Sequence, residues 1–145
     1  MTGPDATGPA ADYALLARAA RGELEALRQL AMFGISVARA NDDPFALMEG
    51  LVFARLAAAI GDQTDAQFLL MALGSLSDFA HACPNQEQWA DDTDAEMLIV
   101  AARLADVGAE HADRVLLGMS TATSARAALL ARELVDAMPL MGGIV

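Results

Sequence analysis

The chain has 145 residues, enough for one domain with its own hydrophobic core. Twenty acidic residues outnumber nine basic ones, all arginine, and the net charge of −11 excludes nucleic acid and anionic membranes as expected partners, because both are polyanions. The single cysteine, Cys83, excludes an intrachain disulfide, and the longest apolar stretch, Leu51–Ile60, is far shorter than the ~20 residues of a membrane span.

The N-terminal residues, 1–10, contain two Gly-Pro pairs and no apolar period, so we expect a flexible leader there. Residues 1–11 also lack the basic segment and the apolar run of a signal peptide. Because the lone cysteine fits a reducing compartment, we expect the protein to be cytoplasmic.

From residue 11 onward, Ala, Leu, Arg, Glu and Met dominate, and β-branched and aromatic residues are too sparse for strands. The expected fold class is therefore all-α. About seven helices are expected, over 11–21, 23–34, 44–60, 64–78, 93–107, 109–119 and 122–138. Together they form a helical domain over 11–138, and an apolar C-terminal tail covers 139–145.

Local signals at the helix ends support these boundaries. Asp43-Pro44 is an N-cap followed by proline at the first helical position, where the missing N–H costs nothing. The spacings of Thr64 with Gln67 and of Thr93 with Glu96 are typical of capping boxes.

A pattern around three glycines recurs at intervals of about 40 to 50 residues, a period typical of solenoids of helix pairs. Gly22, Gly61 and Gly108 each follow an apolar stretch, where a left-handed residue ends one helix and lets the next begin. Each is followed by a small residue and then a leucine: Ala26 and Leu30, Ala66 and Leu70, Ala112 and Leu116. We expect these alanines to face a neighbouring antiparallel helix, because small side chains let helices approach closely.

The sequence Glu-Gly-Leu-Val-Phe-Ala-Arg-Leu-Ala-Ala-Ala-Ile-Gly-Asp at 49–62 resembles the second helix of a Sel-one-like repeat, with phenylalanine in place of the usual tryptophan. Ala-Gln-Phe-Leu-Leu at 66–70 is similar to the segment that opens the next repeat, and Gly34 with Val37 to a remnant of its Gly-x-Gly-Val turn. The resemblance implies stacked antiparallel helix pairs in a short right-handed superhelix of the tetratricopeptide type. The longer second interval is assigned to an extended loop at Ser75–Asp92.

Motifs for catalysis or metal binding are missing from the sequence: it has no glycine-rich phosphate loop, no Gly-x-Ser-x-Gly and no His-Glu-x-x-His. His81-Ala82-Cys83 offers two ligands where a closed zinc site needs four. The acidic run 91–96 lacks the glycine of a calcium loop and is expected at a helix N-terminus instead. We therefore expect no catalytic residues, no metal and no cofactor.

These observations favour a non-enzymatic interaction module that binds a protein or peptide segment, basic in character, or a second copy of itself. By its resemblance to tetratricopeptide arrays, the first helix of each pair lines the concave face. The residues expected to contact the partner there are Glu25, Arg28, Asp65, Phe68, His111 and Arg114. The methionines spread over the helices are expected to fill the core, a Met-lined groove being the alternative.

Two other interpretations stay open. One is a helical bundle with a small-molecule pocket, an enzyme in one version, in which Arg55, Arg103 and the acids around residue 94 converge. The other is a homodimer whose first and last helices, both rich in alanine and leucine, pair across a two-fold axis.

Overall fold

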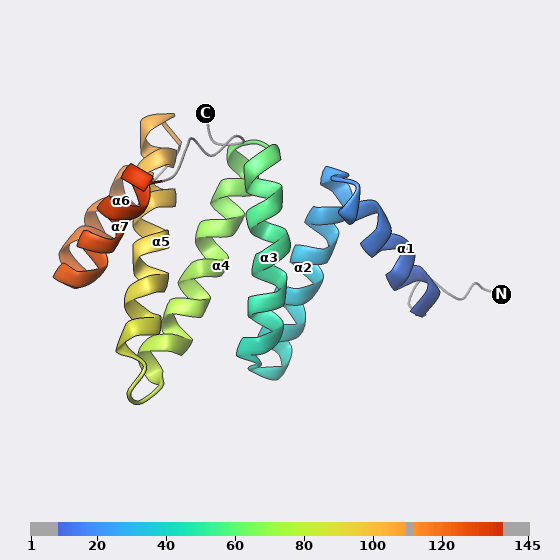
Figure 1. Cartoon of the computed structure of the whole chain (residues 1–145), viewed down its shortest axis with the longest axis horizontal. Helices are drawn as coiled ribbons and strands as arrows, with labels where there is room; N and C mark the ends of the chain where they lie inside the picture. Colours follow the sequence, from blue (N-terminus) through green and yellow to red (C-terminus); the bar gives the residue numbers. More distant parts are fainter. Residues whose placement is uncertain (1–8, 110–111, 138–145) are drawn as a thin grey trace.

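Seven α-helices make up the described part of the chain, residues 9–109 and 112–137, in the computed structural model (Figure 1). Their bounds are α1 Pro9–Ala20, α2 Leu24–Asn41, α3 Pro44–Ile60, α4 Gln63–Ala82, α5 Glu87–Asp106, α6 Ala112–Ala122 and α7 Ala125–Ala137. The expected all-α fold class is confirmed. The apolar tail expected at 139–145 lies outside the described residues.

The helices stack in chain order. Helix α2 packs on α3, α3 on α4 and α4 on α5, while α5 also carries both α6 and α7. Figure 1 shows α2 to α5 running alternately up and down in one row, with α1 leaning away at one end and α6 and α7 at the other. Short corners force this antiparallel order, because two to four residues leave the chain no room to travel between helices.

Two of the three glycine corners have the expected backbone. Gly22 and Gly108 have φ of +82° and +72°, the left-handed conformation that glycine adopts without steric cost. Gly61 differs, with φ of −91°. It is glycine for a steric reason, since a Cβ there would collide with the carboxylate of Asp65 and come within 2.7 Å of the Ala57 carbonyl oxygen.

The start of α4 is capped by a different pair of residues from the expected Thr64 and Gln67. Asp62 accepts a hydrogen bond from the Thr64 amide at 2.9 Å, and its own N–H donates to Asp65 Oδ2 at 3.0 Å. Helix α3 starts as expected, with the Asp43 carboxylate accepting from the amide of Phe45 at 2.9 Å.

Helix α2 runs seven residues beyond the expected end, through Gly34 to Asn41. Gly34 is therefore no turn remnant, and the interpretation of Gly34 with Val37 as such is wrong. It lies where α2 crosses α3, and a Cβ on it would be 2.7 Å from the Cα of Gly50. The two glycines let the backbones of α2 and α3 approach closely. This contact explains why glycine, which usually weakens a helix, is found at position 34 in the interior of α2.

The prediction of an extended loop at Ser75–Asp92 is also wrong. Helix α4 continues to Ala82 and α5 begins at Glu87, so only residues 83–86 connect them, with Cys83 exposed. Thr93 is inside α5 and not at its N-cap, and its hydroxyl donates to the Trp89 carbonyl oxygen at 2.9 Å. The acidic run 91–96 consequently forms the second turn of α5 and the turn after it.

The expected alanine contacts are confirmed: Ala26, Ala66 and Ala112 are all buried. The main core lies between α2, α3, α4 and α5, and its largest fully buried side chains are Leu47, Leu51, Leu69, Leu73, Val100 and Leu104. Among the described residues, no helix combines the length and apolarity that crossing a membrane requires.

Candidate functional site

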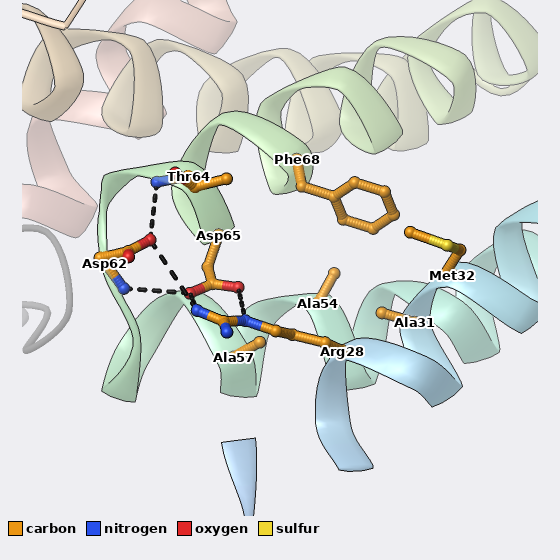
Figure 2. Close-up of a pocket in the computed structure, with 9 residues that line it drawn as sticks. All are labelled: Arg28, Ala31, Met32, Ala54, Ala57, Asp62, Thr64, Asp65 and Phe68. Carbon is orange, nitrogen blue, oxygen red and sulfur yellow. Dashed lines mark hydrogen bonds and ion pairs between the residues drawn. The ribbon is translucent and has the colours of Figure 1, made fainter. Parts of the chain in front are cut away.

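A groove of about 350 Å³ opens between α2 and α4, with α3 beneath it. We call it the α2–α4 groove. Its lining residues are Arg28, Ala31, Met32, Ala54, Ala57, Asp62, Thr64, Asp65 and Phe68 (Figure 2). Three of the residues expected to contact a partner, Arg28, Asp65 and Phe68, are therefore in one place.

One end of the groove is an ion pair between α2 and α4. Arg28 Nε lies 2.7 Å from Asp65 Oδ1, and Arg28 Nη2 lies 2.7 Å from Asp65 Oδ2, so the guanidinium and the carboxylate meet edge to edge. The Asp65 side chain is 6% exposed and the Arg28 side chain 38%. Asp62 and Glu25 stand further from the guanidinium, at 3.9 and 4.0 Å.

The environment keeps both groups of this pair charged. Hydrogen bonds from Arg28 lower the pKa of Asp65, and the backbone N–H of Asp62 lowers it further, while burial acts in the opposite direction. The hydrogen bond to Asp65 likewise raises the pKa of Arg28 above its usual value. Asp65 therefore has two roles: it pairs with Arg28 and it caps α4. Its carboxylate also occupies the space that a Cβ at position 61 would need, so that position is restricted to glycine.

The other end of the groove is apolar. Figure 2 shows the ring of Phe68 and the thioether of Met32 facing each other across the groove, away from the ion pair. Met32 is 59% exposed and Phe68 half-buried. Small side chains beneath them, Ala31, Ala54 and Ala57, leave the hollow open. The expectation that the methionines fill the core is wrong for Met32, which lines a groove instead.

The six residues expected on one face are only partly gathered. Glu25 is beside Arg28 at the edge of the α2–α4 groove. Arg114 is exposed on α6 and lines a separate groove together with Ser77, His81 and Asp94. His111 lies outside the described residues. Arg114 is separated because α6 packs on α5 and continues the stack at its far end.

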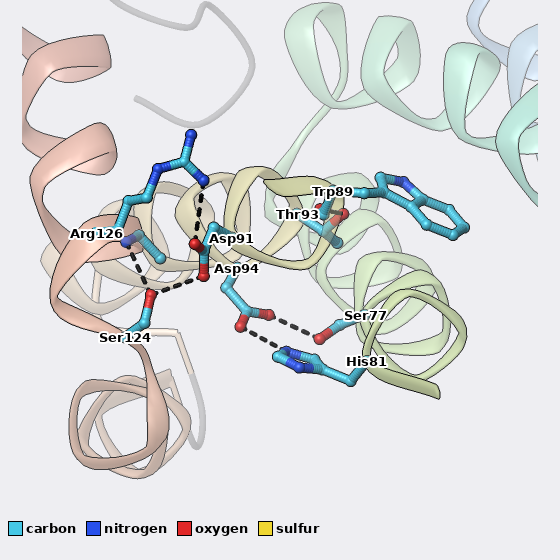
Figure 3. A network of polar contacts seen from close by, with 9 residues as sticks. Ser77, His81, Trp89, Asp91, Thr93, Asp94, Ser124 and Arg126 are labelled. Atoms are coloured by element: carbon cyan, nitrogen blue, oxygen red, sulfur yellow. Dashed lines mark hydrogen bonds and ion pairs between the residues drawn. The ribbon is translucent and has the colours of Figure 1, made fainter. Parts of the chain in front are cut away.

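A second polar cluster joins α4 to α5 (Figure 3). The Ser77 hydroxyl donates to Asp94 Oδ1 at 2.7 Å, and His81 Nε2 lies 2.8 Å from Asp94 Oδ2. A nucleophilic triad needs histidine between serine and aspartate, as the base that takes the hydroxyl proton. Here the aspartate is in the middle, so the Ser77 hydroxyl is bound to a carboxylate and not to the imidazole of His81.

Asp91 extends the polar contacts from α5 to α7. Its carboxylate accepts from the Ser124 hydroxyl at 2.7 Å and lies 3.1 Å from Arg126. The Ser124 hydroxyl first, and Arg126 second, lower the pKa of Asp91. The contacts of Ser77 and His81 with Asp94 were not predicted from the sequence, because Ser75–Asp92 was interpreted as a loop. The four-residue spacing of Ser77 and His81, which places both on one face of a helix, was the signal that could have found them.

Some of the groups expected to converge in a small-molecule pocket do so: Arg55 and two of the acids near residue 94, Asp92 and Glu96, line one groove between α3 and α5, whereas Arg103 is not among its lining residues. Arg55 binds Glu96 between α3 and α5, with Nε 2.7 Å from Oε2 and Nη2 2.8 Å from Oε1. Asp94 instead turns toward α4. Within the described residues, no group of three or more His, Cys, Asp or Glu side chains is placed to hold a metal ion.

Comparison with known proteins gives no family: no family model, no curated protein and no solved structure matches this chain. The α2–α4 groove offers a fixed charge pair at one end and exposed apolar surface at the other, an arrangement suited to binding.

Proposed function

We propose that this chain is a non-enzymatic helical-repeat module, related to the Sel-one-like and tetratricopeptide arrays, that binds a segment of another protein in the α2–α4 groove. The groove itself carries the proposal. It combines a thioether and an aromatic ring, both accessible, with an arginine that is already oriented by Asp65. Such a surface can hold an apolar side chain and offer hydrogen bonds to a backbone without losing freedom on binding.

A repeated linkage between alternate helices supports the repeat interpretation. Arg28 on α2 reaches Asp65 on α4, 37 residues away, and Arg55 on α3 reaches Glu96 on α5, 41 residues away. Both links are two-pronged and both skip one helix. Each link joins matching helices of neighbouring pairs, first helix to first and second helix to second, as the stacking of helix pairs requires. The single, exposed Cys83 fits a reducing compartment, and we assign the module to the cytoplasm.

The test is selection of binding peptides from a random linear library displayed on phage, followed by affinity measurement with fluorescently labelled peptides. Met32→Gln is the groove variant, because its side chain is largely exposed and the fold does not depend on it. Met71→Gln, exposed on α4 away from this groove, is the matched control. We expect the selected peptides to bind Met32→Gln about tenfold more weakly than wild type and to bind the control normally.

Failure has two forms in this experiment. A library that yields no saturable binder contradicts a peptide-binding role. Binders that are insensitive to Met32→Gln place the binding surface elsewhere and contradict the assignment to the α2–α4 groove.

A further inference from the structure

The outward face of α3 is apolar along its whole length. Among its 17 residues, only Glu49 and Arg55 are charged. Five large apolar side chains, each between 43% and 75% exposed, follow one another on this face at spacings of three or four residues: Phe45, Met48, Val52, Leu56 and Ile60. We call this face the α3 stripe. A helix that is apolar all round is normally buried on every side. The exposed α3 stripe is therefore a candidate interaction surface.

A groove of about 400 Å³ runs beside the stripe, between α3 and α5. Met48 and Val52 of the stripe line it, together with Trp89 of α5. Figure 3 shows the Trp89 indole pointing away from the Asp91 contacts with α7. Stripe and groove therefore form one continuous apolar surface with a half-buried indole at its side.

The rim of this surface is acidic. Glu96 is neutralised by its two-pronged contact with Arg55. Glu49 and Asp92 also line the groove, and both are exposed. The charge that a partner meets around the apolar surface is consequently negative, in keeping with the net charge of −11.

We propose that the α3 stripe and the α3–α5 groove bind an amphipathic helix of a partner protein, with apolar side chains every three to four residues and arginine or lysine along both flanks. The straight, helix-length stripe matches the apolar face of such a helix, and the rim matches its charge. A second copy of this chain is a poorer occupant, because it also carries a charge of −11 and would bring its own Glu49 and Asp92 to the interface. The proposal stands on a different face from the α2–α4 groove and does not depend on it.

Trp89, the only tryptophan of the chain, reports on this surface directly. The probe is a synthetic helical peptide of about 18 residues, with leucine at spacings of three and four, arginine on the flanks and alanine elsewhere. A second peptide has glutamate in place of every arginine. We expect the basic peptide to change the Trp89 fluorescence in a saturable manner and the acidic peptide to leave it unchanged.

Two double variants, each with its own control, distinguish binding at this surface from general attraction of a basic peptide to an acidic protein. Val52→Gln with Leu56→Gln removes the stripe at constant charge, and Leu117→Gln with Leu129→Gln, both exposed on α6 and α7, is its control. Glu49→Gln with Asp92→Asn neutralises the rim, and Asp106→Asn with Asp113→Asn makes the same change in net charge elsewhere. We expect the stripe and rim variants each to weaken binding of the basic peptide about tenfold or more, and both controls to bind as wild type.

Equal binding of the two peptides, or wild-type affinity in the stripe variant, overturns the proposal. Sedimentation of the chain alone gives an independent check. A concentration-dependent dimer that is dissolved by Val52→Gln with Leu56→Gln identifies a second copy as the occupant, and the proposed basic helix is then wrong.

Discussion

Arg55 on α3 and Glu96 on α5 meet edge to edge, with 2.7 Å between Nε and Oε2 and 2.8 Å between Nη2 and Oε1. Their contact repeats, one helix further along the chain, the contact of Arg28 with Asp65. Two-pronged pairs fix the angle between guanidinium and carboxylate as well as the distance. The two pairs therefore fix the spacing of alternate helices at two neighbouring places in the stack.

The Arg55–Glu96 pair is expected to contribute measurably to stability. In a double-mutant cycle with Arg55→Gln and Glu96→Gln, we expect a coupling free energy of about 0.5 to 1.5 kcal/mol from urea unfolding, because the pair is partly shielded from solvent. The coupling should fall in 1 M salt. The exposed Arg18–Glu23 contact, at 3.4 Å, is the control and should couple only within experimental error. Equal coupling in both cycles would contradict a special role for the first pair.

Asp65→Asn should destabilise the fold by about 1 to 3 kcal/mol, since it weakens the two hydrogen bonds with Arg28 at a buried position. Glu25→Gln is the matched control, because Glu25 is exposed and 4.0 Å from the same guanidinium. Its urea midpoint should equal that of wild type. A midpoint in Asp65→Asn as high as in Glu25→Gln would show that the pair does not hold α2 to α4.

The contribution of Asp65 should disappear in acid. Its pKa in the folded chain is lowered by Arg28, whereas in the unfolded chain it is near the ordinary value of about 3.9. The folded state therefore binds the proton less readily, so the stabilisation is complete above the unfolded pKa and is lost as the pH falls through the folded one. Unfolding free energies of wild type and Asp65→Asn should converge as the pH falls below the unfolded pKa of about 3.9, and a constant difference would argue against the lowered pKa.

Gly34→Ala should destabilise the chain by about 1 to 3 kcal/mol, although alanine is the better helix former, because the new methyl group would force α2 and α3 apart. Gly118→Ala gives the opposite sign. Position 118 is in α6, and nothing lies within 4 Å of the Cβ it would gain. We expect a stabilisation of up to about 1 kcal/mol there. Thermal unfolding of both variants decides the matter, and stabilisation of Gly34→Ala would refute the close crossing.

Asp43→Ala should cost about 1 kcal/mol, because the carboxylate accepts hydrogen bonds from two amides at the start of α3. Gln86→Ala tests the N-cap of α5, where the side chain makes no such bond. Its unfolding free energy should stay within about 0.5 kcal/mol of wild type. Comparable losses in the two variants would mean that the Asp43 side chain is not the cap that matters.

The helical content and several corners could be predicted from the sequence, because they depend on interactions within a few residues. Asp43-Pro44 favours a helix start through local hydrogen bonding and the fixed φ of proline, and Gly22 and Gly108 readily adopt the left-handed backbone that ends a helix. The burial of Ala26 and Ala66 also followed from the sequence, since small residues spaced one turn after a corner face the neighbouring helix.

Other features depend on residues far apart in the chain and became visible with the packing of the helices. In the sequence, Gly34 is typical of a helix end. In the structure it lies against Gly50 of α3, inside a longer α2, and this contact is not encoded in the residues around it. The acids around residue 94 were predicted at a helix start. Asp94 instead lies inside α5, where it contacts Ser77 and His81 of α4. The candidate site has the same origin. Arg28 and Asp65 were expected on one surface, but their edge-to-edge contact is fixed by the packing of α2 and α4 on α3, which no short-range pattern encodes.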